Sequence, residues 1–279
     1  MVMNTRTAAI VGAATLLLLA AGGLGWHLLG PTPPAAAPDQ TAAPLPVPPV
    51  PPRLAEGDRY DQCLAMLPDD PRGAASFAAG WTDGGEGAAH CQAMAEVALG
   101  DVEAGAEHLQ RVAAASHAAP AARAAVYGQA AGAWLMAGNA AKAFEAGTAA
   151  LALAPEDVDL RIDHAIAAGA LNRFEDALDD LTRALDQEPR RTEALVLRAA
   201  AWRHLGLVDL AQDDIDRAIV MAPDNAEALL ERGILRQRRN DWLGARSDWQ
   251  RAIELAPDSA TADLAEQNLA LLEAGPTRK

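Results

Sequence analysis

Residues 183–195 read RALDQEPRRTEAL, and residues 217–229, which lie 34 positions later, read RAIVMAPDNAEAL. Related stretches stand on either side, LALAPEDVDL from residue 151 and RAIELAPDSATADL from residue 251. Alanine also recurs every 34 residues, in two series, and so does proline. The second half of the chain is therefore a repeated unit, marked by Pro155, Pro189, Pro223 and Pro257, by Ala143, Ala177, Ala211 and Ala245, and by Ala150, Ala184, Ala218 and Ala252.

Each unit has the composition of two closely packed helices. Alanine is abundant, whereas aromatic residues make up 4% of the chain and β-branched residues are sparse. This composition favours helices over strands. Proline cannot donate the next backbone hydrogen bond and disfavours a helical residue before it, so the second helix of each unit should end at the proline. We therefore expect an all-α fold.

A 34-residue period with small residues inside and a closing proline resembles the tetratricopeptide repeat, a helix–turn–helix unit. The resemblance implies a right-handed α-solenoid of four units, residues 124–257, with residues 258–273 as a capping helix. Leu264, Leu269 and Leu272 would cover the last unit. The family's small eighth position is occupied by Ala131, Ala165, Ala199 and Gly233, its usually aromatic eleventh position by Trp134, Ala168, Trp202 and Arg236, and its large position in the second helix by Gly147, Leu181, Ile215 and Trp249.

The second and fourth units depart from the aromatic pattern, which puts their local packing in doubt. We expect Trp134, Trp202, Trp242 and Trp249 to pack between helices, with an aromatic ligand site as the alternative.

Residues 58–123 follow the repeat less closely. The stretch HCQAMAEVALGDVEAGAEHLQRVAAA is a degenerate helix pair with its turn at Gly100 and Asp101, and it needs four extra residues before the next unit. Two short helices, broken between Pro68 and Pro71, are expected before it. The pattern YDQCLAML…DP…GW…GG…AAHCQAMA resembles the N-terminal part of exported tetratricopeptide proteins of alphaproteobacteria.

The N-terminus predicts a membrane anchor. Residues 7–29 contain no Asp, Glu, Lys or Arg, and as a helix they would rise about 35 Å, enough to cross a bilayer core. Arg6 precedes this segment and the next cation is Arg53, so the positive-inside rule keeps residues 1–6 in the cytoplasm and exports the rest. A cleaved signal sequence is the alternative, but Pro38 would follow its small-residue cleavage site.

Residues 30–57 are predicted to be a spacer. Ten prolines lie between Pro31 and Pro52, and such a segment cannot build a packed core. It would hold the following domain away from the membrane; a proline-rich ligand for another protein is the alternative.

The net charge of −15 lies wholly from Arg53 onward, because Arg6 and Asp39 cancel. A domain of this charge repels phosphate backbones, which argues against nucleic-acid binding.

No catalytic, cofactor or metal site is predicted. The glycine-rich stretch GWTDGGEGAAHCQAM from Gly80 has Glu86 where a phosphate-binding loop needs lysine. His90 and Cys91 are adjacent, so on a helix they point about 100° apart and do not form a catalytic pair. In an exported domain Cys63 and Cys91 favour a disulfide, with two buried free thiols as the alternative.

Function in such arrays comes from the face lined by the first helix of each unit. The resemblance places on this face a stripe of apolar residues with charged residues along its edge. The lysine–asparagine clamp that some family members use to bind C-terminal carboxylates is missing. Arg203 and Arg238 are candidate anchors, unless they are solvated or paired within the array. We expect a non-catalytic scaffold for a peptide or helix of a protein partner in the bacterial envelope, periplasmic and inner-membrane-anchored; a self-associating structural component is the alternative. The candidate groove comprises Ile162, Ile166, Glu193, Val196, Arg203, His204, Glu227, Leu230, Ile234, Gln237 and Arg238.

Overall fold

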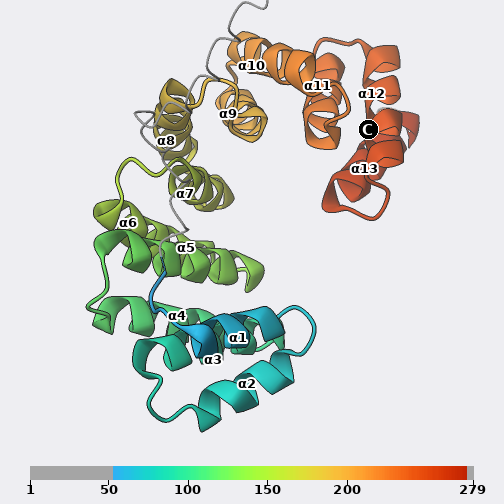
Figure 1. Ribbon diagram of the computed structural model, residues 1–279. Coiled ribbons are helices and arrows are strands. Elements are labelled where there is room, and N and C mark those ends of the chain that lie inside the picture. The colour runs from blue at the N-terminus through green and yellow to red at the C-terminus, as the bar shows by residue number, and fades with distance from the viewer. Residues whose placement is uncertain (1–52, 275–279) are drawn as a thin grey trace, which may run out of the picture. The chain divides into compact units, whose positions relative to one another are not determined.

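The computed structural model describes residues 53–274, which lie in the larger of two compact units, residues 48–279. Within the described range the chain forms thirteen α-helices and no strand (Figure 1). Their bounds are α1 Asp58–Met66, α2 Pro71–Gly80, α3 Gly85–Ala98, α4 Val102–Ala115, α5 Pro120–Met136, α6 Ala140–Leu153, α7 Val158–Ala170, α8 Phe174–Gln187, α9 Thr192–His204, α10 Val208–Met221, α11 Ala226–Arg238, α12 Trp242–Leu255 and α13 Ala260–Ala274.

Four regular helix pairs follow one another, α5–α6, α7–α8, α9–α10 and α11–α12 (Figure 1). Each helix packs against the next one in the chain, as expected of a stacked repeat. The first helices of neighbouring pairs also contact one another, α5 with α7, α7 with α9, α9 with α11 and α11 with α13. The first helices therefore form a common face. The first pair begins at Pro120, four residues before the expected start at residue 124.

The turn inside each pair depends on one residue in the left-handed region. Gly138 has φ 74°, Asn172 58°, Gly206 78° and Asn240 63°, and these positions follow the 34-residue period. Glycine and asparagine tolerate this conformation, which ends the first helix and redirects the chain. Gly100, with φ 95°, has the same role between α3 and α4. It precedes Gly138 by 38 residues, so the predicted four-residue insertion is present.

In the last three pairs a small residue on the first helix stands opposite a larger one on the second, whereas the first pair has Ala131 and Gly147 at these positions. Gly233 meets Trp249, which is fully buried and donates a hydrogen bond from Nε1 to the Leu230 carbonyl at 3.2 Å. Trp134 is fully buried as well, and Trp202 is partly buried against the core. Trp242 differs from the expectation: it is 46% exposed, because it begins α12 at the turn edge of the unit.

Helix α13 closes the array, but not with all three predicted leucines. Leu269 and Leu272 pack against the cluster around Trp249, whereas Leu264 is 50% exposed. In the repeat register Leu264 corresponds to Leu230, on the face of the first helices. The positions of α11 that pack against a second helix, Leu229, Arg232 and Gly233, correspond in α13 to Asp263, Glu266 and Gln267. This polar side suits a terminal cap.

The N-terminal region is tied to the array by buried contacts. Tyr60 Oη lies 2.7 Å from His90 Nδ1, and His90 Nε2 lies 2.6 Å from Gln129 Oε1 of α5. Leu54 is buried with the core residues of α3 to α5, so the end of the predicted linker, which extended to residue 57, packs onto the domain.

Cys63 and Cys91 face each other between α1 and α3. Their Cα atoms are 6.2 Å apart, a separation that suits a disulfide, and their sulfur atoms lie at bonding distance.

Between residues 53 and 274, no helix combines the length and the apolar character needed to span a bilayer. The predicted anchor, residues 7–29, and most of the proline-rich segment lie outside the described residues.

Candidate functional site

The predicted apolar stripe lies on α7, α9 and α11, and its members differ in accessibility. Ile162, Val196 and Leu230 are buried, with 2%, 6% and 8% of their surface exposed, so they serve mainly the packing between neighbouring first helices. Ile166 and Ile234, one turn later, are partly exposed. The accessible part of the stripe is therefore narrower than the sequence pattern indicates.

A pocket of 230 Å³ opens in this face between α7 and α9. One side is closed by Phe174 and His204, whose rings stack with centroids 4.3 Å apart and planes 8° from parallel. Gly169 forms part of its wall, and a Cβ placed there would meet no atom within 4 Å. The lining is otherwise apolar: Ala165, Ile166, Ala177, Leu181, Leu197, Ala200 and Ala201.

The two candidate anchors, Arg203 and Arg238, lie in the last turns of α9 and α11 and have different environments. Arg203 donates from Nε to Glu231 Oε1, and both side chains are largely buried, so Arg203 joins α9 to α11. Arg238 is exposed, and its guanidinium lies 3.4 Å from the Arg203 carbonyl. Within residues 53–274 Arg238 forms no ion pair with an Asp or Glu. Of the two arginines, Arg238 is therefore the one whose charge is available.

His204 lies between these arginines and the pocket. Burial lowers the pKa of its imidazole, and the nearby charges of Arg203 and Arg238 lower it further. His204 is therefore neutral at pH 7 and contributes a flat ring rather than a charge. Gln237 is partly buried beside Arg238.

The opposite margin, at the N-terminal ends of the first helices, is acidic. Glu193 and Glu227 are exposed there, and Arg191 pairs with Asp159 at 2.5 Å and with Glu193 at 3.4 Å. Asp163 lies behind them, and burial raises the pKa of its carboxyl to about 6, with further increases from the charges of Glu193, Asp159 and Asp157. Arg191 opposes this shift.

Replacing Asp163 with Asn should stabilise the protein at pH 7.5 by about 1 kcal/mol. Because the folded-state pKa lies above the ordinary value of 3.8, ionising Asp163 costs stability above pH 6, and the penalty fades as pH falls towards 4. The expected gain in stability is smaller than the full pKa shift implies, because the carboxyl is partly solvated. Urea unfolding at pH 7.5 and at pH 4 measures this change in the free energy of unfolding. Asp179→Asn, at an exposed position, is the control. Equal stability of Asp163→Asn and wild type at pH 7.5 would contradict the assignment.

A hydrogen-bonded polar pair joins the two helices of each of the last three units, and in the last two units it is an arginine–aspartate ion pair. His164 Nδ1 lies 2.6 Å from Asp180 Oδ2, Arg198 binds Asp214 through two bonds of 2.7 and 2.8 Å, and Arg232 binds Asp248 through two of 2.9 and 2.7 Å. The partners are always 16 residues apart, and the pairs recur every 34 residues.

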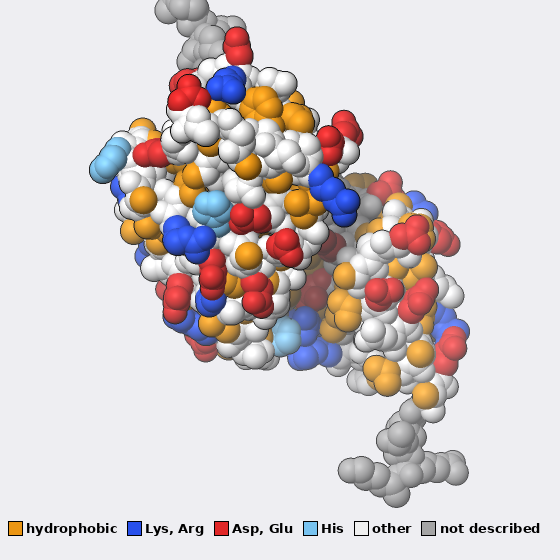
Figure 2. Space-filling model, turned by 90° about the horizontal axis from the view of Figure 1, so that it is seen from below, with side chains coloured by type: hydrophobic (Ala, Val, Ile, Leu, Met, Phe, Trp, Pro, Cys, Tyr) orange, Lys and Arg blue, Asp and Glu red, His pale blue; other side chains and the backbone are white. Residues whose placement is uncertain are grey.

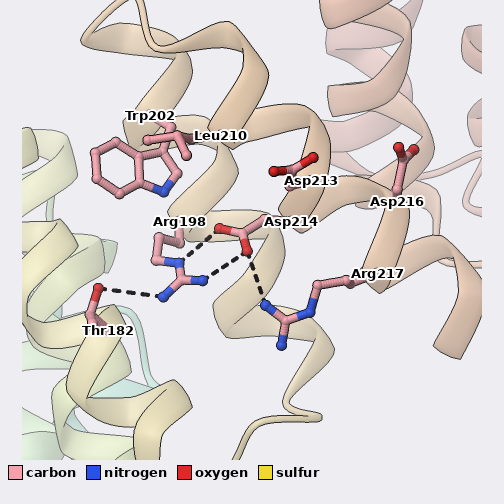
Figure 3. A pocket seen from close by; sticks show the side chains of 8 residues that line it. All are labelled: Thr182, Arg198, Trp202, Leu210, Asp213, Asp214, Asp216 and Arg217. Carbon is pink, nitrogen blue, oxygen red and sulfur yellow. Dashed lines mark hydrogen bonds and ion pairs between the residues drawn. The ribbon is translucent and has the colours of Figure 1, made fainter.

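Figure 3 shows the Arg198–Asp214 pair in a 640 Å³ surface pocket, where Thr182 and Arg217 also contact it. Arg198 and Asp214 bind each other within the array, so we assign this pair a structural role. These pairs are absent from the predicted site, although their shared spacing of 16 residues can be read from the sequence.

The histidine and cysteine side chains considered for a metal or reactive site lie apart or are engaged elsewhere. No group of three or more His, Cys, Asp or Glu side chains in residues 53–274 converges in a way that could hold a metal ion. His90 is engaged by Tyr60 and Gln129, and Cys91 faces Cys63 rather than His90. Figure 2 shows acidic, basic and apolar side chains interspersed over the face drawn, without the basic stripe typical of nucleic-acid binding.

Two family models match the second half of the chain. Both describe the tetratricopeptide repeat, one over residues 162–226 and the other over residues 208–270. These matches support the interpretation of the 34-residue units as tetratricopeptide repeats. No curated protein sequence matches the chain significantly.

Several solved structures share the fold at low sequence identity. PilF of Pseudomonas aeruginosa has a TM-score of 0.58 at 14% identity, over 75% of this chain and 96% of that one. A thermophilic tetratricopeptide repeat protein of Thermus thermophilus has a TM-score of 0.53 at 21% identity, over 67% of this chain and 100% of that one. A chain of the Cut9–Hcn1 hetero-tetramer of the APC/C has a TM-score of 0.56 at 15% identity. The match covers 76% of this chain and 42% of that one. At these identities the likeness concerns the fold.

Proposed function

We propose that this chain is a non-catalytic adaptor that binds a segment of another protein on the face formed by α7, α9 and α11. Tetratricopeptide repeat proteins generally act as protein-interaction scaffolds. The observation that carries the proposal is the apolar pocket between α7 and α9, whose lining residue His204 lies near the exposed Arg238. An apolar concavity with a few polar groups at its margin is typical of sites that recognise peptides.

The location proposed for this adaptor is the periplasmic side of the inner membrane. The support comes from the uncharged segment 7–29, from the cation distribution around it and from the proline-rich spacer that follows. The partner would then be another envelope protein.

Photo-crosslinking in cells tests the binding face. A photoreactive amino acid at Ile234, on the groove face of α11, should give discrete crosslinked products, which mass spectrometry can identify. The same group at Val220, which is 84% exposed on the second helix α10, is the matched control. Discrete products at Val220 and none at Ile234 would contradict the proposal. Arg203→Ala is unsuitable as a test, because it would leave Glu231 buried without its partner.

Oxidation of the cysteines tests the location. If the domain is exported, Cys63 and Cys91 should be joined in cells, since their Cα separation permits a disulfide. Protein unfolded directly from cells in the presence of an alkylating agent should then gain no label without reductant and two labels after reduction. Two labels without reductant would count against the disulfide and against export.

The second candidate is a structural component that self-associates. The exposed Leu264 and Leu271 of α13 favour it, because apolar side chains at the end of an array can contact another copy. Sedimentation over a range of concentrations separates the two functions: a persistent monomer excludes self-association.

A further inference from the structure

The pocket between α7 and α9 has the size of a receptor for one side chain. Its 230 Å³ is below the roughly 300–1,000 Å³ of pockets that hold whole small molecules. Its floor comes from alanines and leucines of α7, α8 and α9, and the stacked rings of Phe174 and His204 form a flat wall. Such a cavity suits a bulky apolar anchor, the kind of residue that dominates the energetics of protein interfaces.

The charges around this pocket leave one cation without a partner. Arg203 is neutralised by Glu231, Arg173 pairs with Asp176 at 2.6 Å, and His204 is uncharged at pH 7. Arg236, on the side of α11 that faces α12, is held by Asp248 and Asp241. Among the described residues near the pocket, only Arg238 remains exposed and without an ion pair, so this margin attracts an anion although the domain as a whole is acidic.

We propose that the pocket binds a bulky apolar side chain of the partner, and that an Asp or Glu next to it in the partner's sequence pairs with Arg238. This inference rests on the proposed adaptor function and narrows it to an apolar–acidic recognition motif. We expect this carboxylate to belong to a side chain within the bound segment of the partner, and not to the end of its chain. The pocket fixes the position of the segment, and the single guanidinium of Arg238 supplies the charge.

Two glycines allow the pocket to be blocked with a matched control. Gly169 lines the pocket, while Gly132 lies on the same face of α5, outside it, and at both positions an added Cβ meets no atom within 4 Å. Leucine is a better helix former than glycine, so Gly169→Leu and Gly132→Leu should both fold. Only Gly169→Leu puts a side chain into the pocket. Arg238→Ala removes an exposed charge and should also fold.

The test is a random-peptide display selection against the full-length protein in detergent micelles, with peptides fused to the coat protein at their C-terminal end. Because no free C-terminal carboxylate is then available, acids in the selected peptides must be side chains. We expect enrichment of Phe, Leu or Met next to Asp or Glu. A synthetic peptide of that sequence, amidated at its C-terminus, should lose tenfold or more in affinity with Gly169→Leu and with Arg238→Ala, and less than twofold with Gly132→Leu.

The outcomes separate this inference from the proposed function. The proposed motif is wrong if the selected peptides lack the apolar–acidic pattern, or if they bind Gly169→Leu as well as wild type. If those peptides still lose binding to Ile234→Asp, the proposed adaptor function stands. If no selected peptide responds to Gly169→Leu, Arg238→Ala or Ile234→Asp, the groove is not a peptide site and both proposals fail.

Discussion

Asp214→Ala should lower the free energy of unfolding by about 3–5 kcal/mol, as measured by urea denaturation. The carboxylate is 5% exposed and accepts two hydrogen bonds from Arg198, whose side chain is 16% exposed (Figure 3). Removing it leaves a desolvated guanidinium with only the 3.4 Å contact to Thr182 Oγ1. Losing one partner of a buried pair is far costlier than losing both, because the remaining charge is uncompensated.

Two further variants identify the cause of that loss. Asp213→Ala removes the neighbouring carboxylate, which is exposed in the same pocket, and should change stability by less than about 0.5 kcal/mol. Arg198→Met/Asp214→Leu removes both charges and should recover most of the loss. If the double variant were as unstable as Asp214→Ala, packing rather than the unpaired charge would be responsible.

Gly233→Ala should destabilise the protein by about 2–3 kcal/mol, although alanine is the better helix former. A Cβ at Gly233 would lie 2.6 Å from Trp249 Cδ1 and closer still to Nε1. The indole is fully buried and cannot move away without displacing α12 from α11. Thermal and urea unfolding followed by circular dichroism measure the effect.

The neighbouring unit supplies the compensating change. There, Ala199 faces Ile215 at the positions that Gly233 and Trp249 occupy. Gly233→Ala/Trp249→Ile copies this combination and should be more stable than Gly233→Ala alone. Gly132→Ala, where the added methyl group meets open space, should stabilise the protein by up to about 1 kcal/mol. A destabilising Gly132→Ala would show that backbone effects, not the contact with Trp249, explain the result at Gly233.

Much of the fold could be predicted because the repeat depends on local rules. Helices α8 and α10 end two residues before Pro189 and Pro223, and the turn positions Gly206 and Asn240 follow the same period. The prediction that Leu264 covers the last unit is wrong, since periodicity places a residue on a helix face but not against a neighbour. Leu264 falls on the face that α13 shares with the groove, where half of its surface is exposed among residues 53–274.

The candidate site was less predictable, because its electrostatics depend on contacts between units. Arg203 and Arg238 look equivalent in the sequence, yet Arg203 is paired with Glu231, which is 28 residues away on the next first helix. Pocket formation depends on the stack of Phe174 and His204, which come from different units. The pairs of Arg198 with Asp214 and of Arg232 with Asp248, in contrast, could have been found from their shared spacing.

The turn residues of the four pairs follow a pattern of their own. Glycine and asparagine alternate at the left-handed position, Gly138, Asn172, Gly206 and Asn240, and tryptophan precedes only the two glycines, at Trp134 and Trp202. A longer period of two units is therefore superimposed on the single repeat. Lengthening or shortening the array by two units at a time would keep this alternation at the turns, whereas a change by one unit would break it.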